Sequence, residues 1–325
     1  KKRNFFVDKK FSKFNSITKK INNRKINKII ITGMGTCHTA AEAIACYMRE
    51  NFYLLLPRIS ISAVIASEGS AFHMENNMKK TLIIAIAQSG TTKDTNTYVE
   101  MAKKRGAHTM AILNKRNGDI SYIVDDVLYL GNGRDVEIAV PSTKTYHCHL
   151  ILGYIFTLYI ISKISNDLNK IKKKLNEVLK VSKIISLILK KKKTENHDNL
   201  YKKFSNSNNW YCLYDGQSKK YASMEIRIKL SECCYKTIPY MDVKNFIKNE
   251  IENSLIVYDV GLETNKLEYV IKQVIKKKNY VILIGDEKKL EKIKKNKYIY
   301  KISYPLTLKD FSIIFSVLSG KILSF

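Results

Sequence analysis

Three short segments in the first half of the chain combine glycine with hydroxyl or amide side chains, a mixture that suits the binding of an anion. The segments are Gly33-Met34-Gly35-Thr36-Cys37, Gln88-Ser89-Gly90-Thr91-Thr92 and Val140-Pro141-Ser142-Thr143-Lys144. Hydroxyls and amides donate hydrogen bonds to a phosphate, and glycine lets the backbone approach it closely. The same residue types cap helices, which is compatible with anion binding. Composition alone therefore leaves phosphate binding and simple capping both open.

Cofactor and metal sites are not predicted. The turn at 33–37 lacks the third glycine of a dinucleotide-binding turn, because position 38 is His38, and this disfavours NAD. His147 and His149 flank Cys148 in an apolar, helix-like segment, where core packing is the simpler interpretation. The six cysteines form no CxxC pair and no disulfide-like spacing, which indicates reduced thiols and a cytoplasmic protein.

The second half carries a row of charged residues at helical spacing. Glu225, Lys229 and Glu232 stand at i, i+4 and i+7, so they share one face of a helix. Such a row is often an exposed set of ion pairs. Alternatively, a buried carboxylate with a pKa near neutrality can act as a general base, and a nearby lysine can counter the charge that develops on a substrate.

The elements that position these residues alternate between strand and helix along the chain. Strands are expected at 28–32, 81–87, 108–113, 127–130, 210–214, 254–258, 280–285 and 298–303, and helices at 39–53, 93–105, 142–162, 221–234 and 306–322. This alternation predicts an α/β fold with two domains, each a doubly wound parallel sheet flanked by helices. The expected divisions are a basic helical segment at 1–27, a first domain at 28–162, a helical connector at 163–207 and a second domain at 208–325. Ligands bind beyond the carboxyl ends of such strands.

The net charge of +28 raises the question of an anionic partner. Lysine accounts for most of it, and it occurs together with asparagine, isoleucine and tyrosine, which favours biased composition over a functional basic surface. No zinc finger, basic leucine zipper or aromatic RNA-binding signature accompanies the charge, so no specific nucleic-acid partner is expected. The most apolar stretch, Leu150 to Ile161, is too short to span a bilayer, so no membrane segment is predicted.

Taken together, the three glycine- and hydroxyl-containing segments resemble the first sugar isomerase (SIS) domain of the glutamine–fructose-6-phosphate aminotransferase family. The third segment extends back to Glu137, and Ser67-Glu68 resembles a turn of that family. The resemblance covers about residues 28–162. It implies that the sugar phosphate is bound by residues of all three segments, namely Thr36, Cys37, Gln88, Ser89, Gly90, Thr92 and Ser142. Cys37 and Ala87 depart from the family pattern, which often has serine at both positions.

The second half resembles the family less closely. The helix with Glu225 and Lys229 matches the one that faces the sugar in the family, and Glu232 matches the base that moves a proton between C1 and C2. The family's ring-opening histidine is expected near 245–250, where this chain reads Asn-Phe-Ile-Lys-Asn-Glu. The lysine that forms a Schiff base with the ketose also has no match, nor does the glutaminase domain.

The resemblance implies an isomerase or aminotransferase acting on fructose 6-phosphate, with ammonia supplied by a glutaminase domain or partner. It also implies a homodimer, because the family often builds its active site from two subunits. Two alternatives stay open: deamination of an amino-sugar phosphate, and a non-catalytic module that binds a phosphosugar as a sensor or regulatory subunit.

Overall fold

The computed structural model describes residues 9–72, 74–131, 137, 142–165, 167–194, 207, 209–261 and 264–324. The chain divides into two compact units, Lys1–Asn176 and Glu177–Phe325. The division falls inside the long helix α8 (Leu168–Thr194), which lies in the expected helical connector. Part of that connector, 195–206, lies outside the described residues, and the finer domain boundaries stay predictions.

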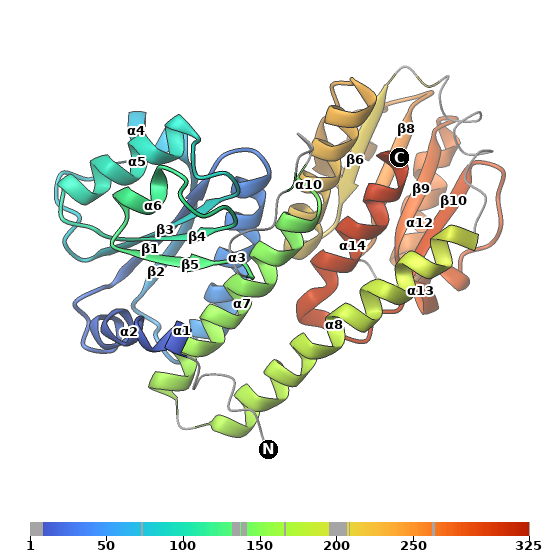
Figure 1. Cartoon of the computed structure of the whole chain (residues 1–325). Helices are drawn as coiled ribbons and strands as arrows, with labels where there is room; N and C mark the ends of the chain where they lie inside the picture. Colours follow the sequence, from blue (N-terminus) through green and yellow to red (C-terminus); the bar gives the residue numbers. More distant parts are fainter. Residues whose placement is uncertain are drawn as a thin grey trace. The chain divides into compact units, whose positions relative to one another are not determined.

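The first unit contains a parallel five-stranded sheet in the order β2-β1-β3-β4-β5 (Figure 1). Its strands are β1 (Lys28–Gly33), β2 (Ser60–Ile65), β3 (Thr81–Ala87), β4 (His108–Leu113) and β5 (Asp126–Tyr129). Its helices are α1 (Lys9–Ser12), α2 (Asn15–Asn22), α3 (Thr36–Phe52), α4 (Ala66–Phe72), α5 (Lys93–Lys104), α6 (Ile120–Ile123) and α7 (Lys144–Ile164). The expected parallel sheet is therefore confirmed. Strand β2 was not predicted, because it is an edge strand with serine at alternate positions and only partial burial.

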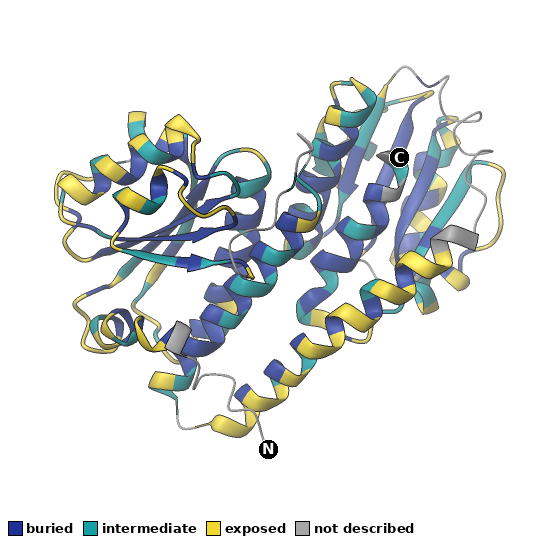
Figure 2. Cartoon of the chain, in the orientation of Figure 1, coloured by how far each residue is buried: buried dark blue, intermediate teal, exposed yellow. Residues whose placement is uncertain are grey.

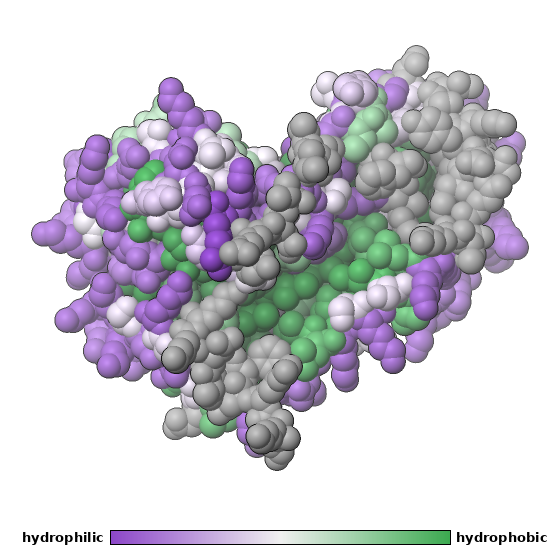
Figure 3. Space-filling model, viewed as in Figure 1, coloured by the Kyte–Doolittle hydropathy of each residue, from purple (hydrophilic) through white to green (hydrophobic). Residues whose placement is uncertain are grey.

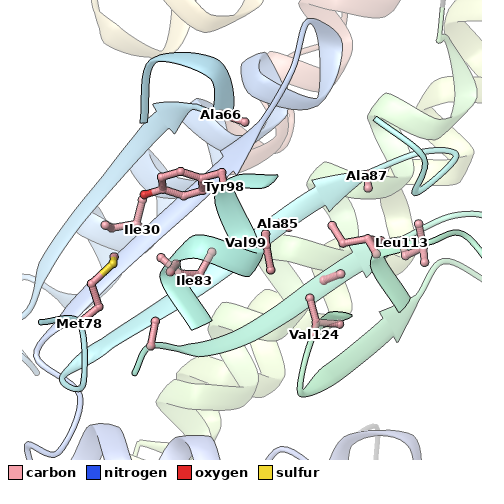
Figure 4. Packing of buried hydrophobic residues seen from close by; sticks show 14 residues of the cluster. Ile30, Ala66, Met78, Ile83, Ala85, Ala87, Tyr98, Val99, Leu113 and Val124 are labelled. Atoms are coloured by element: carbon pink, nitrogen blue, oxygen red, sulfur yellow. The ribbon is translucent and has the colours of Figure 1, made fainter. Parts of the chain in front are cut away.

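Helices cover both faces of this sheet, so its central strand is buried on both sides. All seven residues of β3 are buried, as the unbroken apolar run from Leu82 to Ala87 predicts. Helices α3 and α7 pack on one face, and α4, α5 and α6 on the other. Figure 4 shows Val99 of α5 beside Ile83 and Ala85 of β3, within the larger cluster on that face. The packed faces hold the carboxyl ends of the strands in place.

The second unit has the same type of sheet, with parallel strands in the order β10-β9-β8-β6-β7. Its strands are β6 (Trp210–Tyr214), β7 (Tyr240–Asp242), β8 (Leu255–Asp259), β9 (Tyr280–Asp286) and β10 (Ile299–Tyr304). Its helices are α10 (Gln217–Cys234), α11 (Val243–Lys248), α12 (Thr264–Lys276), α13 (Glu287–Glu291) and α14 (Ser312–Gly320), with 3₁₀ turns η1 (Lys309–Phe311) and η2 (Lys321–Ser324). Helices α10 and α14 pack on one face, and α11, α12 and α13 on the other. Read in chain order, both sheets follow a 2-1-3-4-5 arrangement, which is that of flavodoxin-like folds.

Burial follows this layered arrangement. Figure 2 shows the central strands of both sheets as buried, the edge strands as only partly buried and the outer faces of α5 and α8 as largely exposed. Figure 3 shows hydrophilic side chains over most of the visible face of the first unit. Helix α7 is the one described helix that is long and apolar enough to cross a membrane, but 61% of its most apolar window is buried inside the protein. It therefore has the character of a core helix.

Candidate functional site

The first two predicted segments lie at the switch point of the first sheet. Strand β1 pairs with β2 on one side and with β3 on the other, so the order in which successive strands are added to the sheet reverses between β1 and β3. The residues after Gly33 and the residues after Ala87 follow the carboxyl ends of these two neighbouring strands. Ser67 and Glu68 lie in α4, directly after β2, on the same edge of the sheet. This is the edge at which open α/β sheets bind ligands.

The segment Gln88–Thr92 forms a tight turn between β3 and α5. Gly90 has a φ of +77°, a left-handed conformation that favours glycine. Its carbonyl oxygen accepts hydrogen bonds from the amide of Ile120 at 2.9 Å and from the side chain of Asn96 at 3.2 Å. The Ser89 hydroxyl lies 2.9 Å from the Thr91 hydroxyl. These contacts hold the turn in one conformation while the side chains of Ser89, Thr91 and Thr92 stay partly or fully exposed.

Gly118 packs directly against this turn, where a side chain has no room. A Cβ atom at position 118 would lie 2.3 Å from the carbonyl oxygen of Ser89 and 2.9 Å from Cα of Gly90. Both are backbone atoms, so the turn itself would have to move. We expect Gly118→Ala to lower the free energy of unfolding by about 1–3 kcal/mol, as overpacking does, measured by thermal and chemical denaturation.

The matched control is Lys115→Ala, because Lys115 is exposed on the same connection and its contact with the turn is made by its backbone amide. Stability of Gly118→Ala equal to that of wild type would contradict the packing argument.

The start of α5 has no side-chain cap from its N-cap residue. Thr92 is the N-cap residue, and its side chain makes no capping hydrogen bond to the helix. The amides of a helix's first turn carry partial positive charge and attract anions. Here they stand next to the hydroxyls of Ser89 and Thr91 and the Thr92 hydroxyl. The turn therefore combines both kinds of donor that a phosphate prefers.

Thr36 and Cys37 begin α3 at the neighbouring turn. Gly35 is the N-cap residue with a φ of +52°, and a Cβ atom there would meet nothing within 4 Å. The side chains of Thr36 and Cys37 are both partly exposed. The structure thus brings the first and second predicted segments to adjacent strand ends, as the sequence predicts.

The third predicted segment begins α7, and its donors face an acidic side chain of the same segment. The Glu137 carboxylate accepts hydrogen bonds from the hydroxyls of Ser142 at 3.2 Å and Thr143 at 2.7 Å. It also accepts from the amides of Thr143 at 2.6 Å, Lys144 at 2.8 Å and Thr145 at 3.2 Å. Ile138 to Pro141 lie outside the described residues. Ser142 therefore lies at the start of α7 with its hydroxyl directed to Glu137.

Two contacts connect α7 and its acidic cap to the turn after β3. The side-chain amide of Gln88 donates to the carbonyl oxygen of Glu137 at 3.2 Å. His149 is buried, and its Nε2 lies 3.2 Å from the carbonyl oxygen of Ala87, the last residue of β3. Burial lowers the pKa of His149 to about 4, so the ring is neutral at pH 7 and can donate this hydrogen bond. This contact was not predictable from the sequence, because an apolar helix context predicts only that the ring is buried.

In the second unit, the charged row on α10 is largely buried. Glu225 and Lys229 are 0% and 1% exposed, whereas Glu232 is exposed. The Lys229 ammonium donates to Glu232 at 2.7 Å and lies 3.6 Å from Glu225. Lys321, at the start of η2, adds a second buried ammonium 3.9 Å from Glu225. The interpretation as a fully exposed ion-pair row is therefore wrong for Glu225 and Lys229, and the sequence did not predict the contribution of Lys321.

The switch point of the second sheet, between β6 and β8, holds a different cluster. The Lys219 ammonium donates to the carboxylate of Asp259 at 3.0 Å, to the Tyr304 hydroxyl at 2.9 Å and to the Ser316 hydroxyl at 3.0 Å. All four residues are buried. Burial raises the pKa of Asp259 to about 6 although Lys219 opposes the shift. Burial also acts to lower the pKa of Lys219, but Asp259 and Tyr304 outweigh it, so this pKa is raised. The ammonium of Lys219 and the carboxylate of Asp259 thus neutralise each other at the switch point of the second sheet. At the corresponding point the first sheet has the turn Gln88–Thr92, whose hydroxyls are partly or fully exposed.

Residues 22–159 match the family model of the SIS domain. The chain is 41% identical over 148 residues to a glutamine–fructose-6-phosphate aminotransferase (isomerizing) of Clostridium tetani, a match that covers 45% of this chain and 22% of that protein. The chain thus spans less than a quarter of the length of this curated relative.

Solved structures extend the likeness of fold to the whole chain. The C-terminal domain of glucosamine-fructose-6-phosphate aminotransferase from Francisella tularensis has a TM-score of 0.80 and 24% identity, covering 95% of this chain and 86% of that one. A glucosamine-6-phosphate deaminase from Thermotoga maritima has a TM-score of 0.66 and 13% identity, covering 97% and 89%. At these identities the structures support the two-sheet fold and no more.

Proposed function

We propose that this chain, whose residues 22–159 form an SIS domain, binds a phosphorylated ketose and catalyses proton transfer between its C1 and C2 atoms. Fructose 6-phosphate is the proposed substrate, and the product is an aldose phosphate, or glucosamine 6-phosphate when ammonia is supplied by a glutaminase domain or partner. A homodimer in the cytoplasm is the proposed assembly and location. The likeness to aminotransferase relatives supports the choice of substrate class.

One observation carries the proposal: the turn Gln88–Thr92 presents hydroxyls beside the uncapped start of α5, at the switch point of the first sheet. A phosphate monoester carries nearly two negative charges at pH 7, and helix N-termini with adjacent hydroxyls bind such groups well. Thr36, Cys37 and Ser142 are proposed to contact the same ligand from the starts of α3 and α7.

Glu232 is proposed as the general base. An exposed carboxylate can reach a substrate, and the ammonium of Lys229 at 2.7 Å can counter the charge of an enediol intermediate. Glu225 is proposed to hold Lys229 from the buried side. No cofactor takes part in this scheme, because the carbonyl group of the sugar itself makes the neighbouring proton acidic.

Ser89→Ala tests the phosphate site. We expect this change to weaken the binding of fructose 6-phosphate by about 10- to 100-fold, because a hydrogen bond to a charged group contributes roughly 1.5–3 kcal/mol. Isothermal titration calorimetry measures the affinity directly. Ser186→Ala is the matched control, since that exposed hydroxyl donates to the Ser182 carbonyl of its own helix.

Equal affinities of Ser89→Ala and wild type would remove the proposed phosphate site. A lysine-rich surface that binds anions without a specific site would give that result, together with an affinity that falls steeply as salt rises.

A non-catalytic phosphosugar-binding module is the second candidate. It is favoured by the absence of any histidine after His197. In the family that this chain resembles, the segment that matches 245–250 carries the ring-opening histidine. Wild type would then bind fructose 6-phosphate but leave its C1 protons unexchanged in deuterium oxide. Release of ammonia from glucosamine 6-phosphate would instead identify a deaminase, the third candidate.

A further inference from the structure

Two helices, α5 and α7, start beside the turn after β3, and they differ in whether a side chain accepts hydrogen bonds from the amides of the first helical turn. Helix α5 has no side-chain cap from Thr92. At α7, the carboxylate of Glu137 receives three backbone amides and two hydroxyls. A phosphate bound at a helix N-terminus uses the same set of donors. Glu137 thus occupies the position that an external anion would otherwise take at α7.

The two helix starts are close to each other. The side chain of Gln88, the first residue of the turn, reaches the carbonyl oxygen of Glu137 at 3.2 Å. His149, on the second turn of α7, contacts Ala87, the residue immediately before Gln88. A sugar bound at the turn 88–92 would therefore lie near Glu137, the residue that caps α7, and a second anionic group on that sugar would be repelled by its carboxylate.

We propose that Glu137 is a specificity-determining residue that serves as a built-in anion at the start of α7, so that the site accepts a sugar monophosphate and rejects a sugar bisphosphate. The inference rests on the proposed function, because it concerns the same ligand. Glu137 also positions the hydroxyls of Ser142 and Thr143 and, through its carbonyl oxygen, the side chain of Gln88. It acts on the ligand through its charge and through these neighbours.

The carboxylate is stable as an anion over the physiological range. Burial acts to raise the pKa of Glu137, but the hydrogen bonds from Thr145, Thr143 and Lys144 outweigh it and lower the pKa to about 2. A folded-state pKa below the unfolded value stabilises the protein above the unfolded pKa of 4.5. This stabilisation is lost as the pH falls from about 4.5 to about 2. The repulsion of a second phosphate therefore persists throughout the neutral pH range.

The test compares fructose 6-phosphate with fructose 1,6-bisphosphate by calorimetry for wild type, Glu137→Ala and Glu137→Gln. We expect wild type to prefer the monophosphate by on the order of tenfold or more, since like charges brought together are strongly disfavoured. In Glu137→Ala the preference should disappear or reverse, and Glu137→Gln should lie between. The exposed Glu100 on α5 gives the matched control Glu100→Gln, which should keep the wild-type preference.

A second measurement needs no sugar. Formate or inorganic phosphate should raise the thermal unfolding temperature of Glu137→Ala, with saturation, by refilling the α7 N-terminus, and should do so far less for wild type and Glu100→Gln. If Glu137→Ala does not fold, Glu137→Gln in the same titrations decides the question. An unchanged monophosphate preference in the variants, or no anion response beyond that of wild type, would overturn the inference. A different result would count against the proposed function alone. In that case the wild-type protein binds neither sugar, but formate or phosphate still raises the unfolding temperature of Glu137→Ala.

Discussion

Replacing Glu232 by glutamine is expected to slow the exchange of the C1 protons of fructose 6-phosphate with solvent by about 10²- to 10⁴-fold, the usual contribution of a general base. The change keeps the size of the side chain and its contact with Lys229, at 2.7 Å in the wild-type protein, but removes the basic carboxylate. Exchange in deuterium oxide followed by proton NMR measures the rate. Binding of fructose 6-phosphate, measured in parallel, should change little, because Glu232 is not among the proposed phosphate ligands.

Glu177→Gln on α8 is a suitable control, since it removes one carboxylate elsewhere in the same unit. A Glu232→Gln protein that exchanges protons as fast as wild type would exclude Glu232 as the base. Absence of exchange in wild type itself, with fructose 6-phosphate still bound, would favour the non-catalytic module.

The second large effect is expected on stability, at the buried cluster between β6 and β8. Lys219→Met removes the ammonium that faces Asp259, a carboxylate with 0% exposure. Breaking a buried ion pair by deleting one partner usually costs about 3–5 kcal/mol, because the remaining charge is left uncompensated. We expect the free energy of unfolding at pH 8 to fall by that amount in urea titrations. Lys220→Met, at the half-buried neighbouring lysine, should have a much smaller effect.

The pH dependence of the same variant follows from the sign of the pKa shift. The pKa of Asp259 is already raised from 3.8 to about 6 by burial, and Lys219 opposes that rise. Without Lys219 the folded-state pKa rises further, so between the unfolded and folded pKa values the folded state binds more protons than the unfolded state. Stability of Lys219→Met should therefore increase as the pH falls from 8 towards 4, and Asp259→Asn in the same background should remove this dependence. A deficit that does not change with pH would contradict the ion-pair explanation.

The sequence predicted the parts of the fold that depend on local pattern. The run Thr81–Ala87 is uniformly apolar after its first residue, and its bounds as a strand are confirmed without change. Strand β2 and the short strand β7 were missed, because each is an edge strand with mixed burial and is stabilised by pairing with a neighbour rather than by its own composition.

The candidate site, like the fold, was predictable where it depends on local sequence pattern. Glycine and hydroxyl residues after a buried strand indicate a ligand-binding turn, and the turns at 33–37 and 88–92 do lie at adjacent strand ends. The cluster of Lys219 and Asp259 has no such pattern, because its members are brought together only by tertiary packing. The same holds for His149 and Lys321, which look in the sequence like an ordinary core residue and an ordinary surface lysine.

The different contents of the two switch points have a consequence for stoichiometry. Both sheets have the same strand order, yet the crevice position of the second is filled by the ammonium of Lys219 and the three oxygen atoms that accept its protons. A repeated architecture would ordinarily suggest two equivalents of ligand per polypeptide. Because the second position is internally neutralised, a titration of this chain with sugar phosphate should reach its equivalence point at a single equivalent.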